Sequence, residues 1–248
     1  SDVPLRFPYY FYDYQIKANL DIDRDHRLTF TRFYGDDVLD FSYEDPSETV
    51  RNENVTIQQD SQFGLDWPWG NQTNGLTWRW IVSPKMITKT FLSNSRYRFD
   101  FDLFFQNRDL YTYSDSTVIN FINFNWNIYD IIKDRTLETE VQYKYSNDHE
   151  ITGGFQIKKI RFDLGIQYDL ETQDTSFTWN PLSLKNNTQE ISFFLQDRWE
   201  VSKRLKIRSG LRLTDYNLHK KIYADPRIGM KYHISDDIAL KANWGLYH

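Results

Sequence analysis

The sequence predicts an all-β fold, in which about ten antiparallel strands form the wall of a transmembrane β-barrel. Three observations predict it. Apolar and polar residues alternate along most of the chain, short polar turns alternate with longer polar segments, and no run approaches the roughly 20 apolar residues of a membrane helix. Successive strand residues point to opposite faces, so alternation produces one apolar and one polar face. Because lipid offers no hydrogen bonds, a sheet spans a membrane only when it closes on itself.

The clearest hairpin covers residues 190–214 and has a polar turn at 202–204. One face of this hairpin is densely charged, with Arg198, Glu200 and Lys206 among its residues. The other face is apolar and consists of Ile191, Phe193, Leu195, Trp199 and Val201 on the first strand and Leu205, Ile207, Leu211 and Leu213 on the second.

The same pattern recurs along the chain. We expect strands within 11–22, 27–41, 76–82, 86–105, 137–145, 151–164, 228–232 and 238–247, in addition to the hairpin above. Short turns are expected at 23–26, 83–85, 146–149, 202–204 and 235–237, and longer loops on the other side near 42–74, 106–117, 164–188 and 217–225.

Two positions depart from the alternation. Arg32 has the same parity as Leu28 and Phe30, and the apolar parity switches between Ile157 and Ile160. Both departures predict a β-bulge, which would re-aim the side chains. For Arg32 the alternative is a place at the membrane interface, where a long side chain reaches the headgroups.

Composition agrees with a membrane barrel. Aromatic residues make up 17% of the chain, with 8 Trp and 17 Tyr, as in the aromatic girdles at both membrane interfaces. The alternative, a soluble two-sheet sandwich, normally has strands of ~5–6 residues, and the segments here often reach twice that length. The absence of cysteine excludes disulfides and thiolate sites. A net charge of −5 argues against nucleic-acid binding.

The charged face predicts a wide, wet interior. Its side chains are too many and too long to fill a dry core, so they need water or a polar plug surface. Cross-strand ion pairing within the wall itself is the plainer role for most of them. The residues expected to face the lumen are Arg96, Arg98, Asp100, Asp102, Glu138, Glu140, Lys144, Lys206, Arg208 and Arg212.

Aromatic side chains in the expected loops are the candidates for ligand recognition. Trp67 and Trp69 lie in the longest loop, and Trp179 and Asn180 lie in another. Such groups could stack on a sugar ring or on an aromatic siderophore group. The alternative is that they cap the outer girdle or pack within their own loops. The five histidines show no ligand spacing, so we expect no metal site and no cofactor.

Several segments resemble the barrel of a TonB-dependent outer-membrane receptor. They are residues 25–35, 189–201, 205–213, 225–232 and 235–248, and the resemblance is strongest from about 189 onward. It implies a 22-stranded barrel, of which residues 1–248 are a section without the N-terminal plug domain and the final strands. It also implies TonB-driven uptake of siderophores, cobalamin, haem, carbohydrates or peptides across the outer membrane of a Gram-negative bacterium. The implied partners are outer-membrane lipid, the plug and remaining strands, the TonB complex and a surface lipoprotein.

Two other functions remain open. A closed ten-stranded barrel could be a surface protease, which needs a carboxylate and histidine cluster at one rim. Asp215 and His219 are the only close pair of this kind near an expected loop, so we expect no enzyme activity. A passive porin-like channel would share the wall but lack a plug. A plug domain upstream would distinguish the gated receptor from both.

Overall fold

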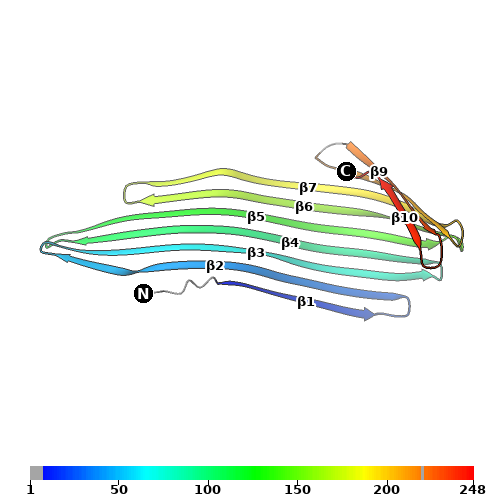
Figure 1. Cartoon of the computed structure of the whole chain (residues 1–248), viewed down its shortest axis with the longest axis horizontal. Helices are drawn as coiled ribbons and strands as arrows, with labels where there is room; N and C mark the ends of the chain where they lie inside the picture. The colour runs from blue at the N-terminus through cyan, green and yellow to red at the C-terminus, as the bar shows by residue number, and fades with distance from the viewer. Residues whose placement is uncertain (1–7, 219–220) are drawn as a thin grey trace.

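The chain forms a single antiparallel sheet whose strands follow one another in sequence order (Figure 1). The computed structural model describes residues 8–218 and 221–248. Within them, no helix is long and apolar enough to cross a membrane. The strands are β1 (Tyr9–Asp21), β2 (His26–Asn52), β3 (Val55–Ser83), β4 (Met86–Thr112), β5 (Thr117–Lys144), β6 (His149–Thr172), β7 (Ser176–Glu200), β8 (Leu205–Tyr216), β9 (Lys221–His233) and β10 (Ala239–Gly245).

The ten strands and the five short turns on one side confirm the sequence prediction. The turns are tightened by local hydrogen bonds. In the β1–β2 turn, the carboxylate of Asp23 accepts bonds of 2.8 Å from the backbone N–H groups of Asp25 and His26. In the β5–β6 turn, the Ser146 hydroxyl accepts bonds from the N–H groups of Asp148 and His149 in the same way. This side of the sheet is called the turn-proximal end below.

The expected long loops are wrong for three of the four segments. Residues 42–74, 106–117 and 164–188 belong mostly to β2–β7, and β2 and β3 are joined by two residues only. Strand β4 has 27 residues, about 90 Å at ~3.4 Å per residue, whereas a tilted membrane strand needs about 9–11. The long strands therefore extend far past any bilayer. His219, one of the two candidate protease residues, lies outside the described residues.

One face of the sheet, here called the outer face, carries a mostly apolar band at the turn-proximal end, which also includes Asp197, Ser209 and three threonines: Thr88, Thr90 and Thr139. Strand register aligns the residues of this band from strand to strand. Its last row, farthest from the turns, consists of Phe30, Leu76, Leu92, Leu137, Ile157 and Ile191. Aromatic residues lie on the same face near the turns, as in a membrane girdle: Trp78, Trp80, Tyr143, Trp199, Tyr232 and Trp244.

Beyond that row, farther from the turns, the two faces exchange their polarity. The outer face becomes polar and charged, and the opposite face, here called the inner face, becomes apolar. The register is continuous through Arg32 and through residues 157–160, so the bulges expected there are wrong. Both positions mark this exchange instead. Register shifts occur at three other places: Asp45/Glu48, Ile81/Ser83 and Ile166/Tyr168.

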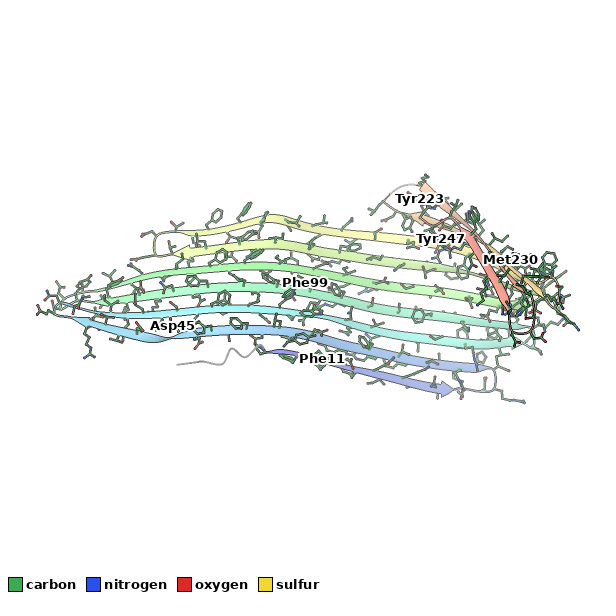
Figure 2. All side chains as sticks on the ribbon, in the orientation of Figure 1. Phe11, Asp45, Phe99, Tyr223, Met230 and Tyr247 are labelled. Atoms are coloured by element: carbon green, nitrogen blue, oxygen red, sulfur yellow. The ribbon has the colours of Figure 1, made fainter. Side chains whose placement is uncertain are left out.

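The sheet has no buried hydrophobic core among the described residues. Side chains project from the strands along their whole length (Figure 2). The accessible surface is 17698 Å², against about 11,700 Å² for a compact protein of this mass. Both faces therefore need covering, the band by lipid and the inner face by other parts of a barrel.

Candidate functional site

The residues expected to face the lumen lie on two different faces. Arg96, Arg98, Asp100 and Asp102 have the same parity as Leu92, a residue of the apolar band, and so lie on the outer face. The expectation that all ten share one interior is therefore wrong, because the polar parity of β4 changes faces beyond the band. The other six lie together on the inner face, at the turn-proximal end: Glu138, Glu140, Lys144, Lys206, Arg208 and Arg212.

Arg212 is the centre of a hydrogen-bond network on the inner face. Its Nη2 donates to the Gln156 Oε1 at 2.7 Å and to the Ser192 Oγ at 2.6 Å, and lies 3.4 Å from the Glu190 carboxylate. Gln156 in turn donates from Nε2 to Glu138 at 2.5 Å. Ser192 is fully buried at the centre. The network joins β5, β6, β7 and β8 through polar side chains, as a wet wall requires.

Lys206 extends this pairing toward the turns. Its Nζ lies 2.6 Å from a Glu200 carboxylate oxygen, and Arg198 lies 3.6 Å from the same carboxylate and 3.8 Å from Glu150. On β5, Glu140 accepts a 2.6 Å bond from the Gln142 amide. Much of the charge on this part of the inner face is therefore matched within the wall.

Farther from the turns, the inner face carries a chain of aromatic rings that we call the inner aromatic row. Trp67 meets Phe101 edge-on at 5.6 Å, and Phe101 meets Trp126 at 5.2 Å. Trp126 stacks on Tyr168 at 5.7 Å and 13°. Tyr168 stacks on Trp179, and Trp67 continues through Trp69 to Tyr9. The row consists of Tyr9, Trp69, Trp67, Phe101, Trp126, Tyr168 and Trp179, on β1, β3, β4, β5, β6 and β7.

Three of the four predicted recognition residues belong to this row, but none lies in a loop. Trp67 and Trp69 are within β3, and Trp179 is within β7. Asn180 lies between Trp179 and Leu182, where the register of β7 against β6 shifts. The Trp-Pro-Trp-Gly segment resembles a loop locally, yet Phe63, Leu65, Trp67 and Trp69 alternate with polar or small residues as an inward-facing strand does.

The row offers ring surfaces for stacking, and two of its indole N–H groups are buried. The indole Nε1 atoms of Trp67 and Trp126 are buried and have no hydrogen-bond partner among the described residues, although buried indole N–H groups usually find one. Trp179 is 54% exposed at the end of the row. Stacking on a flat ring is the chemistry available here, because both of these indole N–H groups are buried. Sequence reasoning missed Phe101, Trp126 and Tyr168, because their neighbours are distant in sequence.

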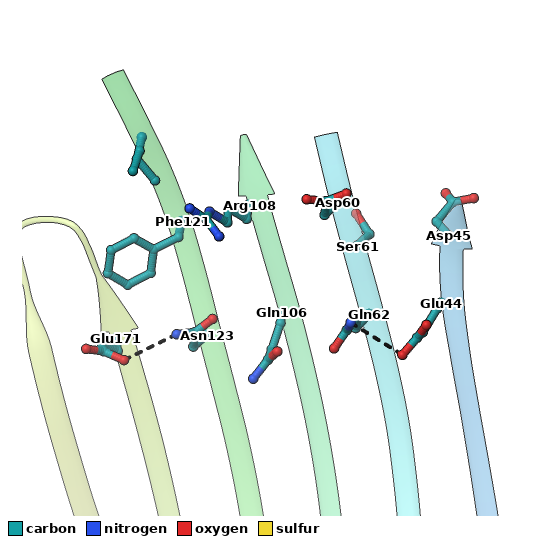
Figure 3. Close-up of a pocket in the computed structure, with 11 residues that line it drawn as sticks. Glu44, Asp45, Asp60, Ser61, Gln62, Gln106, Arg108, Phe121, Asn123 and Glu171 are labelled. Carbon is teal, nitrogen blue, oxygen red and sulfur yellow. Dashed lines mark hydrogen bonds between the residues drawn. The ribbon is translucent and has the colours of Figure 1, made fainter. Parts of the chain in front are cut away.

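A groove of about 1020 Å³ lies on the outer face near the far ends of the strands. Figure 3 shows its polar side chains on adjacent strands. Gln62 donates to Glu44 at 3.4 Å and Asn123 donates to Glu171 at 3.2 Å. No histidine lines the groove. Across residues 8–218 and 221–248, no group of three or more His, Asp or Glu side chains could hold a metal ion.

Two receptors of known structure are similar to this chain. A mutant of the ferric enterobactin receptor PfeA of Pseudomonas aeruginosa is 10% identical, with a TM-score of 0.40, and the match covers 96% of this chain and 43% of that one. The siderophore receptor PirA of P. aeruginosa is 12% identical, with a TM-score of 0.36 and coverage of 94% and 42%. The chain thus spans less than half the length of either receptor.

The translocator domain of the autotransporter NalP from Neisseria meningitidis is 10% identical, with a TM-score of 0.35 and coverage of 96% and 81%. No curated protein sequence matches the chain. The family model described as TonB dependent receptor-like, beta-barrel matches residues 2–246, and the chain therefore belongs to this family of outer-membrane receptor barrels.

Proposed function

We propose that this chain forms part of the barrel wall of a Gram-negative outer-membrane receptor that takes up a scarce nutrient by TonB-driven transport. Membership of the family supports a receptor or transporter. The apolar outer band supports a place in lipid, and the charged inner face near the turns supports a wet interior against a plug domain. The plug, the remaining strands, the TonB complex and a surface lipoprotein are the proposed partners.

The inner aromatic row carries the proposal for the ligand. It lies on the inner face and beyond the apolar band, where a nutrient would pass on its way from outside. Seven rings on six strands present several stacking surfaces to one ring-bearing molecule. We therefore propose that the nutrient has flat or cyclic groups, as an aromatic siderophore or a carbohydrate does.

The closed ten-stranded alternatives have less support. In the described structure β1 pairs only with β2 and β10 pairs only with β9, so the ten strands leave the sheet open. The histidine–carboxylate pairs that the structure describes are His149 with Asp197 at 2.8 Å and His248 with Asp225 at 2.7 Å, and neither includes Asp215.

Ligand binding is testable with the full-length receptor in detergent. Ferric enterobactin and maltohexaose serve as probes, and quenching of tryptophan fluorescence gives the affinity. We expect one probe to bind and Trp126→Leu to weaken binding about 3- to 10-fold, since one lost aromatic contact is worth about 0.5–1.5 kcal/mol. Trp80→Leu, on the outer face, is the matched control and should bind as the wild type does. An equal loss in both variants would contradict a role for the row.

Energy dependence is measured separately in whole cells. Accumulation of the bound probe should stop when a protonophore collapses the inner-membrane gradient that powers TonB. Accumulation that continues unchanged would indicate a passive pore.

A further inference from the structure

Eight cationic side chains gather on the outer face directly beyond the apolar band. They occupy three successive register rows across β2, β4, β5, β6 and β7. The same rows of these strands contain only two carboxylates, Asp36 and Asp163. We call this set the outer cation belt: Arg32, Arg96, Arg98, Lys133, Arg135, Lys159, Arg161 and Lys185.

The boundary between band and belt is one residue row wide. On β5, Leu137 is the last apolar residue and Arg135 the first cation, and on β6 the corresponding residues are Ile157 and Lys159. Residues on one face of a strand are about 7 Å apart. The belt therefore begins where the hydrocarbon ends, at the depth of the lipid headgroups.

In the centre of the belt, on β4, β5 and β6, most cations lack an acidic partner. Arg98 lies 3.4 Å from Asp36, and Arg161 and Lys185 each lie 3.6 Å from Asp163. In the part of the chain that the structure describes, no ion pair forms at the remaining central positions. These are Arg96, Lys133, Arg135 and Lys159, all of them exposed.

Register places like charges directly opposite one another in this region. Arg96 faces Lys133, and Lys133 faces Arg161. Arg135 faces Lys159 in the next row. Directly opposed like charges destabilise a sheet, and an anion that binds across three such pairs in one small area would relieve this repulsion.

The belt also has a shape that could receive such an anion. A groove of about 480 Å³ lies between β5, β6 and β7. Amide and hydroxyl groups add donors at its edge, where the Asn217 side-chain oxygen accepts bonds from the Thr188 hydroxyl and from the Gln189 backbone N–H. Its lining includes four cations of the belt: Lys133, Arg135, Lys159 and Arg161.

We propose that the outer cation belt binds the phosphate groups of an anionic glycolipid headgroup in the outer leaflet. Guanidinium groups bind phosphate oxygens in pairs, and ammonium groups add point charges. The groove continues the surface of the apolar band, so acyl chains can lie on the band while the phosphates meet the cations. This inference goes beyond the proposed uptake function and depends only on the barrel being in a membrane.

The test uses the full-length receptor in detergent and native mass spectrometry. The probes are diphosphoryl lipid A, the same lipid without its phosphates, and inorganic phosphate. The variant carries Lys133→Gln, Arg135→Gln, Lys159→Gln and Arg161→Gln. The matched control removes four inner-face cations with Lys17→Gln, Lys89→Gln, Lys231→Gln and Lys241→Gln. Heat-modifiable migration on gels verifies that both variants are folded.

We expect diphosphoryl lipid A to bind the wild type and the control equally, and the belt variant at least about tenfold more weakly. Equal binding of the dephosphorylated lipid, or undiminished binding by the belt variant, would overturn the proposal. Inorganic phosphate that competes fully at millimolar concentration would show a site for soluble anions and would also overturn it. No nutrient is present in this assay, so its result is independent of the uptake proposal.

Discussion

The two halves of the long strands have the same alternation but opposite polarity. Near the turns, the outer face of β5 carries Leu137 and Val141, and the inner face carries Glu138 and Glu140. Farther along the same strand, the outer face carries Lys133 and the inner face carries apolar residues such as Ile128. The physical difference lies in what each face contacts. Lipid covers the outer face of the first half, and water covers the outer face of the second.

The comparison shows that alternation alone does not identify a lipid-facing surface. A period of two indicates that the two faces differ, and the surrounding medium decides which face is apolar. Inside the distal half, the apolar and aromatic side chains must be covered by other barrel strands, a plug or a ligand, because the described residues bury none of them fully.

The largest expected effect comes from the same charge placed in each half of β5. Val141→Arg puts a cation in the apolar band, and its transfer into hydrocarbon should cost about 2–4 kcal/mol. Ile131→Arg puts the same cation on the outer face beyond the band and should cost less than about 1 kcal/mol. The fraction of heat-modifiable full-length protein in outer membranes measures both. Equal losses would contradict the assigned band.

Two adjacent glycines of β6 test the two faces of the turn-proximal half. A Cβ on Gly154, which faces inward, would lie 2.2 Å from the Thr139 carbonyl oxygen and 2.6 Å from the Phe194 ring. Gly154→Ala should therefore cost about 1–3 kcal/mol through overpacking. A Cβ on Gly153 meets nothing closer than 3.2 Å, at the flexible Leu195 side chain. We expect Gly153→Ala to be nearly neutral in thermal unfolding, and the opposite order would refute this packing.

Two arginines on β8 test whether the hydrogen-bond network around Arg212 stabilises the inner face. Arg212→Gln removes the contacts to Gln156, Ser192 and Glu190, at a cost on the order of 1 kcal/mol. Arg208 lies on the same face opposite Arg198 and makes no ion pair among the described residues. Arg208→Gln should be neutral or slightly stabilising. Denaturant unfolding of the full-length protein compares the two, and equal costs would argue against the network.

The smallest effect concerns two carboxyl groups on the outer face of the distal half. Burial, together with neighbouring carboxylates, raises the pKa of both Asp66 and Asp102. With the folded-state pKa above the unfolded value, the ionised groups destabilise the fold at neutral pH, and stability rises as pH falls through the raised pKa. The double variant Asp66→Asn, Asp102→Asn should lose this part of the rise in Tm as the pH falls from neutral toward the ordinary pKa of an aspartate, about 4. A pH profile unchanged by the substitutions would contradict it.

Several features could be predicted from the sequence. The turns at Asp23–His26 and Ser146–His149 are marked by polar residues that bond their own backbone. The hairpin of β7 and β8 alternates except at Phe194, Asp197 and Ser209, and its faces are as expected. The aromatic character of Trp67, Trp69 and Trp179 predicts a recognition surface, and all three do share one surface, although strands rather than loops position them.

Other features depend on pairing between distant strands. Parity within β4 puts Arg96 on the same face as Leu92, but whether Glu138 of β5 lies on that face cannot be decided within either strand. Register against β3 and β5 decides it. Trp126 and Tyr168 become neighbours for the same reason, since 42 residues separate them in the chain.

By itself the sequence determined that this chain is a meander of ten strands with two unlike faces, because local alternation and turn chemistry need only neighbouring residues. Only the tertiary structure decided where the faces exchange polarity, which rings form the inner aromatic row and which cations form the outer belt. These depend on strand register, and register is a property of paired strands that no single segment contains.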